Sequence, residues 1–323
     1  MKHSAGEPKN MAHVTFIHGI GNKPAADKLL EIWLRSLASG MDGISLGAEG
    51  ITSSMVYWAD VLYAEPDTNV SAYESFGAST PKEVDADAHT RPPVPATVDE
   101  AAFISGLAMK LGGTLAAAEA VEAMPMNRQL EGLPYERIPL PWPLKKAFME
   151  TFLRDVHHYL FNVEFTPRPG LKYKVQDEIR QRFLRAITEG GAKGGPHIVV
   201  SHSMGTVIAY DCLMRVPETE AIDGLLTIGS PLGLDEIQDK LRPEWTRADG
   251  FPSTKLKGSW INIFDKLDPV AGFDPFFSND FQFGGKARIE DLEISNSGIW
   301  RHSIVKYLRS PALRDSLGRL LQL

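Results

Sequence analysis

The 323-residue chain has one cysteine, no surplus of positive charge and no long uninterrupted hydrophobic run. A single cysteine, Cys212, cannot form an intrachain disulfide, and its place in an apolar helical pattern indicates a buried, inert thiol. The formal net charge is −7, and no cluster of lysines and arginines stands out. Because binding to nucleic-acid phosphates needs such a cluster, the sequence predicts no nucleic-acid partner.

The most apolar segment, residues 101–118, is interrupted by Lys110 and consists largely of alanine and glycine. Such a segment is poorly suited to cross a bilayer, which needs about 20 predominantly apolar residues. The first residues lack an apolar stretch of the length that a secretory signal needs, and they predict a disordered lead-in over residues 1–11. We therefore expect a cytoplasmic protein without an integral membrane segment.

What the sequence does contain is an alternation of strand-like and helix-like segments. Six segments have the β-branched or aromatic content of strands, and they occupy residues 13–19, 51–63, 197–201, 221–230, 259–265 and 287–295. Helical patterns occupy residues 27–39, 175–187, 204–215, 300–309 and 312–322. This alternation predicts an α/β fold with a mainly parallel six-stranded sheet flanked by helices on both faces.

The alternation is interrupted over residues 64–168. Residues 77–98 contain four prolines and few large apolar side chains, which is typical of a loop or linker. Residues 101–118 form a candidate helix, weakened at Gly112 and Gly113. A second helix is predicted by apolar side chains that recur every four residues, at Leu144, Phe148, Phe152, Val156 and Leu160. We expect residues 64–168 to be a helical insertion on a core of residues 12–63 and 169–323.

The segment SHSMG, residues 201–205, joins a predicted strand directly to a predicted helix. Its central serine, Ser203, is a favoured type of helix N-cap, so capping alone is one interpretation. A direct strand-to-helix turn between small residues also forms a strained elbow, which lifts the central side chain above the sheet edge. The hydroxyl then lies at a helix N-terminus, where the dipole favours developing negative charge.

This pattern resembles the nucleophile elbow of the α/β-hydrolase superfamily, and the resemblance extends from residue 12 to the C-terminus. Ser201 stands where that superfamily usually has its first glycine. The resemblance implies that Ser203 is a nucleophile, followed along the chain by an acid and then by a histidine. His302 is the only histidine after Ser203, so it is the predicted base. The alternative for His302 is a surface residue at a helix N-terminus.

The segment SWINIFDKLDPVAG, residues 259–272, offers two acids that could orient the histidine. Asp265 lies at the strand end and can serve as a turn residue. Asp268 lies on the following loop and resembles the D-x-V position of many lipases and esterases, so it is the predicted acid. Asp274 and Asp235 are weaker alternatives.

The segment HGIG, residues 18–21, follows the first predicted strand. A tetrahedral intermediate needs backbone N–H groups aimed at its oxyanion. By the resemblance, these come from the residue after the His-Gly pair and from the residue after the nucleophile, which are Ile20 and Met204. His18 is expected to buttress the loop. The predicted supporting residues are His18, Gly19, Gly21, His202 and Gly205.

Together these groups predict a serine hydrolase of the esterase or lipase type, which acts on a small-molecule carboxylic ester with an apolar acyl or alcohol group through an acyl-enzyme. Thioester and amide hydrolysis need the same groups, and a non-catalytic binding protein on this fold is a further alternative. The apolar stripe of the insertion packs against the sheet or a second subunit, or it roofs an acyl pocket. A homodimer is therefore left open.

Neither a cofactor nor a metal ion is predicted. His157 and His158 are neighbours in a predicted helix, so their side chains diverge by about 100° and do not share one ion. The glycine-rich segment GAKGG, residues 191–195, precedes a strand instead of following one, unlike a phosphate-binding loop.

Overall fold

The chain is described here by a computed structural model, which covers residues 11–69, 92–122, 142–241, 247–297 and 300–323. The predicted lead-in of residues 1–11 lies outside the described residues except for Met11, which begins the first strand. Most of the proline-rich segment, residues 77–98, also lies outside them.

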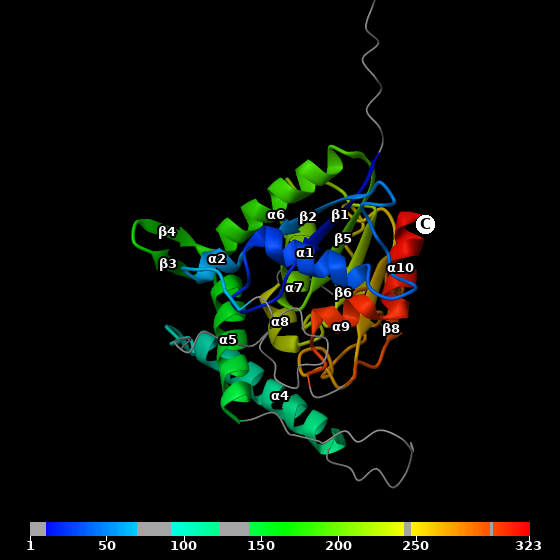
Figure 1. Ribbon diagram of the computed structural model, residues 1–323. Coiled ribbons are helices and arrows are strands. Elements are labelled where there is room, and N and C mark those ends of the chain that lie inside the picture. The colour runs from blue at the N-terminus through cyan, green and yellow to red at the C-terminus, as the bar shows by residue number, and fades with distance from the viewer. Residues whose placement is uncertain (1–10, 70–91, 123–141, 242–246, 298–299) are drawn as a thin grey trace, which may run out of the picture.

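Six parallel strands form the central sheet (Figure 1), and they are β1 (Met11–Ile17), β2 (Thr52–Val56), β5 (Gly194–His202), β6 (Gly224–Ile228), β7 (Trp260–Phe264) and β8 (Ile289–Glu293). Their order is β2-β1-β5-β6-β7-β8, and each neighbouring pair is parallel. Each strand overlaps one of the six predicted segments. The predicted α/β class with a mainly parallel six-stranded sheet is therefore confirmed.

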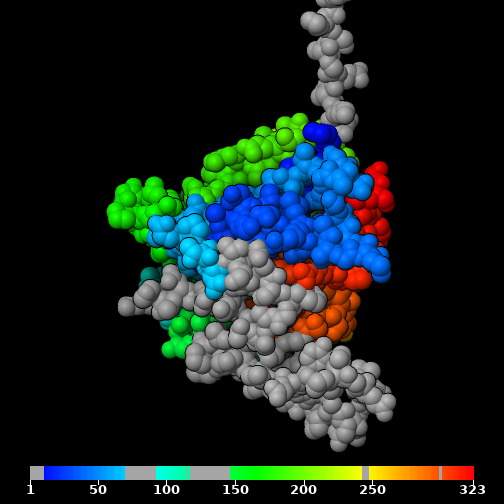
Figure 2. Space-filling view, in the orientation of Figure 1, coloured from blue at the N-terminus to red at the C-terminus, as the bar shows by residue number. Residues whose placement is uncertain are grey.

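Two apolar cores cover the two faces of the sheet, because successive side chains of a strand point to opposite faces. On one face, Ile198 and Val200 of β5 pack with helices α1 (Ala26–Leu37), α9 (Ile304–Arg309) and α10 (Pro311–Leu321). On the other face, Val199 packs with α6 (Val175–Gly191) and α7 (Met204–Arg215). Figure 2 shows α1 beside the C-terminal helices on the outer surface of the first face.

The region that interrupts the alternation contains two long helices, α4 (Val98–Glu122) and α5 (Trp142–Leu160), which pack against each other. Helix α4 runs without a break through Gly112 and Gly113. The predicted stripe of α5 turns inward, since Phe148, Phe152 and Val156 are buried in the same core as α6 and α7. The stripe thus packs against the scaffold.

Other boundaries differ from the predictions. The segment predicted as one strand over residues 51–63 ends at Val56, and α2 (Ala59–Leu62) follows it. A two-stranded antiparallel hairpin, β3 (Glu164–Arg168) and β4 (Leu171–Lys174), crosses the expected end of the insertion. Two short elements were not predicted, α8 (Asp235–Lys240) and the 3-10 helix η2 (Arg247–Asp249). No helix within the described ranges is both long and apolar enough to span a membrane.

Candidate active site

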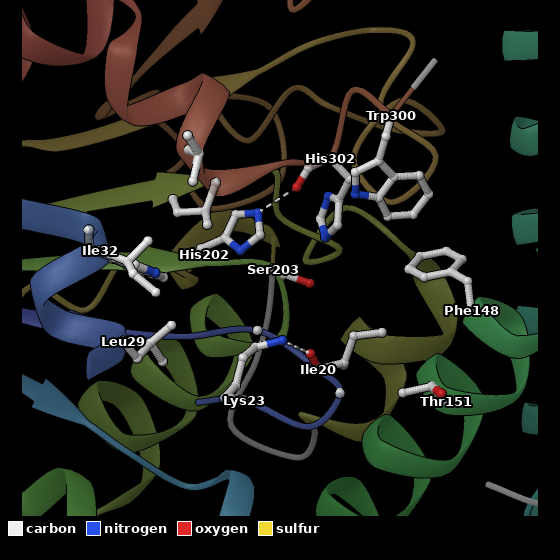
Figure 3. A pocket seen from close by; sticks show the side chains of 15 residues that line it. Ile20, Lys23, Leu29, Ile32, Phe148, Thr151, His202, Ser203, Trp300 and His302 are labelled. Atoms are coloured by element: carbon white, nitrogen blue, oxygen red, sulfur yellow. Dashed lines mark hydrogen bonds between the residues drawn. The ribbon is translucent and has the colours of Figure 1, made fainter. Parts of the chain in front are cut away.

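The candidate site lies where the strand order changes direction. From β1 the chain moves outward to β2, and it later returns to the other side of β1 as β5. The loops that follow β1 and β5 therefore leave the carboxyl edge of the sheet in opposite directions, which opens a crevice for ligands. A narrow cavity of about 40 Å³ lies there (Figure 3). It is bounded by both loops, by α1 and α5, and by the segment that precedes α9.

Ser203 occupies the turn between β5 and α7 in a strained backbone conformation, with φ 55° and ψ −128°. A non-glycine residue in such a region costs about 1–3 kcal/mol and persists only where its surroundings enforce it. The side chain makes no capping hydrogen bond to α7, so capping does not explain the serine. Its Oγ is buried and has no hydrogen-bond partner among the described residues.

Small residues make the elbow possible. A Cβ on Gly205 would lie 2.7 Å from the carbonyl oxygens of Ile17 and His18, so only glycine lets α7 approach the end of β1 this closely. Ser201 stands where the nucleophile-elbow pattern usually has its first glycine. Its buried hydroxyl does not lack a partner, because Oγ donates a hydrogen bond to the Leu226 carbonyl at 3.0 Å.

His302 and Asp268 form a buried pair. Both carboxylate oxygens of Asp268 lie 2.9 Å from His302 Nδ1. Burial alone would raise the pKa of Asp268, but the charge and hydrogen bond of His302 outweigh it, with help from the Val270 amide and the Tyr307 hydroxyl, and the pKa is lowered. An ionised Asp268 keeps the proton of His302 on Nδ1 and leaves Nε2 as the acceptor. At 4% exposed, His302 is not the surface residue of the alternative interpretation.

The other acids considered from the sequence do not contact the His302 ring in the described structure. Asp265 accepts a hydrogen bond from the Asn296 amide at 2.7 Å and pairs with Arg301 at 3.2 Å, so it holds the loop that carries His302. Asp235 pairs with Lys110 at 3.1 Å.

Ser203 and His302 face the same cavity (Figure 3). Neither Ser203 Oγ nor His302 Nε2 has a hydrogen-bond partner in the part of the chain that the structure describes, so the two do not bond to each other in this state. Such contacts are often long before substrate binds and tighten in the reacting complex. The predicted nucleophile and base therefore line the same cavity.

The loop after β1 is buttressed by His18. Its Nδ1–H donates to the Gly19 carbonyl at 2.8 Å, and its Nε2 accepts from the Trp58 amide at 3.0 Å. Burial, reinforced by the charge of Lys23, holds the pKa of His18 well below its ordinary value, so the ring is neutral. The ring also stacks on Trp58, with the ring centroids 4.8 Å apart.

The two predicted oxyanion donors are free of protein acceptors among the described residues: neither the Ile20 amide nor the Met204 amide donates to one. His18 turns the Gly19 carbonyl toward itself. Because a trans peptide points its N–H opposite to its C=O, the Ile20 N–H points away from His18. Met204 is the first residue of α7, where the N–H has no partner within the helix.

Two residues that contact this loop were missed in the sequence. Lys23 Nζ donates to the Ile20 carbonyl, and the Gly21 amide donates to Asp155 Oδ2 at 2.8 Å. Asp155 lies on α5 and is fully buried. One feature of the sequence pointed to Asp155: it is an acidic residue in a helix with many apolar neighbours, and an acid in such a place is rarely buried without a partner.

Residues considered for other chemistry have structural partners. His157 Nε2 lies 3.2 Å from Glu100 Oε2, and the His157 and His158 rings pack edge to face. Within the described residues, no three histidine, cysteine or acidic side chains gather in a way that could hold a metal ion. Cys212 is buried, as predicted, and burial raises its pKa well above the ordinary value.

No protein-family model matches the chain, and no curated protein matches it. Among solved structures, a dienelactone hydrolase from Anabaena variabilis ATCC 29413 is 10% identical with a TM-score of 0.33, over 96% of this chain and 83% of its own. An uncharacterized protein from Pseudomonas aeruginosa has the same identity and TM-score over 97% of this chain, which spans 46% of that protein. The six-stranded parallel sheet flanked by helices is consistent with an α/β-hydrolase fold.

Proposed function

We propose that this protein is a serine hydrolase that cleaves short carboxylic esters through an acyl-enzyme. The observation that carries the proposal is the His302–Asp268 pair, because its His302 ring lines the same cavity as Ser203, whose Oγ has no hydrogen-bond partner among the described residues. A serine hydroxyl is a weak nucleophile until an oriented base takes its proton, and this arrangement supplies such a base.

In the proposed reaction, Ser203 Oγ attacks the ester carbonyl carbon while His302 Nε2 takes the hydroxyl proton. The oxyanion accepts hydrogen bonds from the Ile20 and Met204 amides, and Asp268 stabilises the imidazolium. The intermediate collapses, and His302 returns its proton to the departing alcohol. Water then attacks the acyl-enzyme with His302 again as the base, which releases the acid and restores Ser203.

The insertion supports a role as a cap. Phe148 of α5 lies 4.9 Å from the Trp300 ring and 6.3 Å from the His302 ring, measured between centroids, and all three side chains line the cavity. Ser203 is fully buried beneath them. We infer that α5 covers the site, excludes water during the reaction, and has to move for substrate to enter.

The cavity favours a small apolar group. One buried water molecule needs a cavity volume of roughly 10–15 Å³. With α5 in the position described, a cavity of about 40 Å³ therefore holds only a few non-hydrogen atoms. The wall opposite α5 is apolar and is formed by Leu29, Ile32, Trp33, Ile304 and Val305. We therefore expect acetyl to butanoyl esters to be better substrates than long-chain esters.

The test is hydrolysis of p-nitrophenyl esters from two to twelve acyl carbons by the wild type and by Ser203→Ala. We expect turnover that declines with acyl length, and a loss of roughly 10⁴-fold or more in the variant. Fluorophosphonate should label the wild type and not the variant. Labelling that persists in Ser203→Ala, or no Ser203-dependent turnover of esters, would overturn the proposal.

The ester, the thioester and the amide of the best acyl group are then assayed side by side. Their relative rates show whether the protein prefers an alcohol, a thiol or an amine as the leaving group. Binding of the esters without turnover would instead favour a binding protein on this fold.

A further inference from the structure

The peptide between Ile20 and Gly21 is held on both sides. Its carbonyl accepts a hydrogen bond from Lys23 Nζ, as the dashed line in Figure 3 marks, and its N–H donates to Asp155 Oδ2 at 2.8 Å. The preceding peptide is held at the Gly19 carbonyl by His18. Because peptide units are planar, fixing these groups sets the backbone angles on both sides of the Ile20 Cα. The direction of the Ile20 N–H follows from them.

Asp155 is itself firmly anchored. Its Oδ1 accepts from Arg154 Nε at 2.9 Å and from Nη2 at 2.7 Å, and the Tyr63 hydroxyl donates to Oδ2 at 3.3 Å. The Arg154 guanidinium lies over the Tyr63 ring, 4.5 Å from its centroid. A fully buried carboxylate with both oxygens bonded and an arginine beside it has little freedom to move. It is therefore a rigid acceptor for Gly21.

Helix α5 contributes to the site at three points along one side. Residues three and four apart in a helix lie on the same face. Phe148 and Thr151 line the cavity, and Asp155, one turn further on, bonds the loop after β1. The helix that covers the site thus also holds the loop that carries a candidate oxyanion donor.

We propose that Asp155 is a positioning residue, which keeps the Ile20 N–H aimed at the oxyanion and makes this alignment depend on the docked position of α5. The inference rests on the proposed function. Without the carboxylate, the Gly21 amide loses its acceptor, and the Ile20–Gly21 peptide is held only at its carbonyl, by Lys23. The loop is then less firmly fixed at Ile20. The ground state is affected little, because an ester carbonyl needs the donor far less than the oxyanion does.

The test compares Asp155→Ala with a matched control, Asp211→Ala. Asp211 is also fully buried, and it is bonded by an arginine and a tyrosine, by Arg180 at 2.8 Å and by Tyr159 at 2.7 Å. Its side-chain hydrogen bonds within the described residues go to side chains of α5, α6 and α7 and not to the loop after β1. Both substitutions remove a buried carboxylate that helps to hold α5, so both are expected to lower the melting temperature. Only Asp155→Ala also removes the acceptor of the Gly21 amide, so it should affect the transition state far more.

We expect Asp155→Ala to lower kcat for a short p-nitrophenyl ester by about 10–100-fold with KM changed less than threefold, since complete loss of one oxyanion donor costs about 10²–10³-fold. Affinity for a trifluoromethyl ketone, whose adduct with Ser203 places an oxyanion in the hole, should fall by a similar factor. Asp155→Asn retains an oxygen for the Gly21 amide and should lose less.

Equal losses of kcat in Asp155→Ala and Asp211→Ala, or an unchanged affinity for the trifluoromethyl ketone in Asp155→Ala, would overturn the positioning role. The proposed function is judged separately, by the Ser203-dependent turnover of the wild type in the same assay.

Discussion

His202 Nε2 donates a hydrogen bond to the carbonyl oxygen of His302 at 3.0 Å, and the two imidazole rings lie 4.6 Å apart between centroids. His202 immediately precedes Ser203 in the chain. The hydrogen bond therefore links the backbone that carries the candidate base to the elbow that carries the candidate nucleophile. Burial, reinforced by the charges of His302 and Lys23, holds the pKa of His202 well below its ordinary value, so the donor is a neutral ring.

This link predicts a loss of activity when His202 loses its donor. His202→Phe keeps an aromatic ring without the N–H, and we expect kcat/KM to fall about tenfold, the cost of one hydrogen bond to a neutral acceptor. His202→Gln places an amide donor near the same carbonyl and should recover part of the loss. Because His202 is already neutral, His202→Gln should leave the acid limb of the pH–rate profile in place, and a limb that moves by a full pH unit would contradict this assignment.

The acid is tested by comparing Asp268 with Asp265. Asp268 contacts the His302 ring, whereas Asp265 holds the loop through Asn296 and Arg301. Asp268→Asn should lower kcat by roughly 10⁴-fold, because the amide no longer favours the proton on Nδ1. Asp265→Asn should cost far less. Steady-state kinetics of the two variants, with circular dichroism to check folding, decide the matter: a larger loss in Asp265→Asn would move the acid.

The central strands could be predicted because strands between two layers of helices are rich in buried apolar residues, as in β5, β6 and β7. The exception was the segment of residues 51–63, where Tyr57 and Trp58 continue the aromatic pattern beyond Val56. Trp58 has another task, since its amide and indole N–H bond to His18. The contact of Trp58 with His18 takes the chain out of the β2 strand, and the local sequence does not reveal this contact.

Residues of the candidate site could be predicted from the sequence when a short local motif or their order in the chain marks them. A contact between two segments far apart in the sequence could not be predicted. SHSMG marks Ser203 by itself, and His302 is the only histidine after it. Asp155 lies 134 residues from Gly21, and no pattern in either segment points to the other. The β3–β4 hairpin was missed for a different reason, because Pro167 and Pro169 argue against strands and are tolerated in a two-stranded edge ribbon.

The close approach of the two loops predicts that no side chain is tolerated at Gly19. A Cβ there would lie 2.6 Å from Ser203 Cβ and 3.0 Å from Ser203 Oγ. Gly19→Ala should therefore displace the nucleophile or the loop and lower kcat/KM by more than about 100-fold, since an error of about 1 Å in placement can cost that much. Gly47→Ala is the matched control, because a Cβ there meets nothing within 4 Å. Equal activities of the two variants would show that the elbow is looser than described.

A further prediction concerns stability and depends on two histidines at the other end of the sheet, away from the cavity. His13 bonds with the hydroxyls of Thr52 at 2.7 Å and Ser54 at 2.9 Å, and His197 bonds with Thr15 at 2.8 Å. Burial lowers the pKa of each to about 4, with the charge of Lys193 also lowering that of His13 and the charge of His13 that of His197.

Because these pKa values are lowered in the folded state, the unfolded chain binds more protons between pH 6.5, the ordinary value, and about 4. The free energy of unfolding should therefore fall as the pH falls through this window, by up to about 1.4 kcal/mol per pH unit for each histidine. Above pH 6.5 these two groups should contribute no slope. Urea unfolding at pH 7 and pH 5 measures the difference. The double variant His13→Gln/His197→Gln should show a shallower dependence, and a slope equal to that of the wild type would mean that the two histidines can be protonated without unfolding.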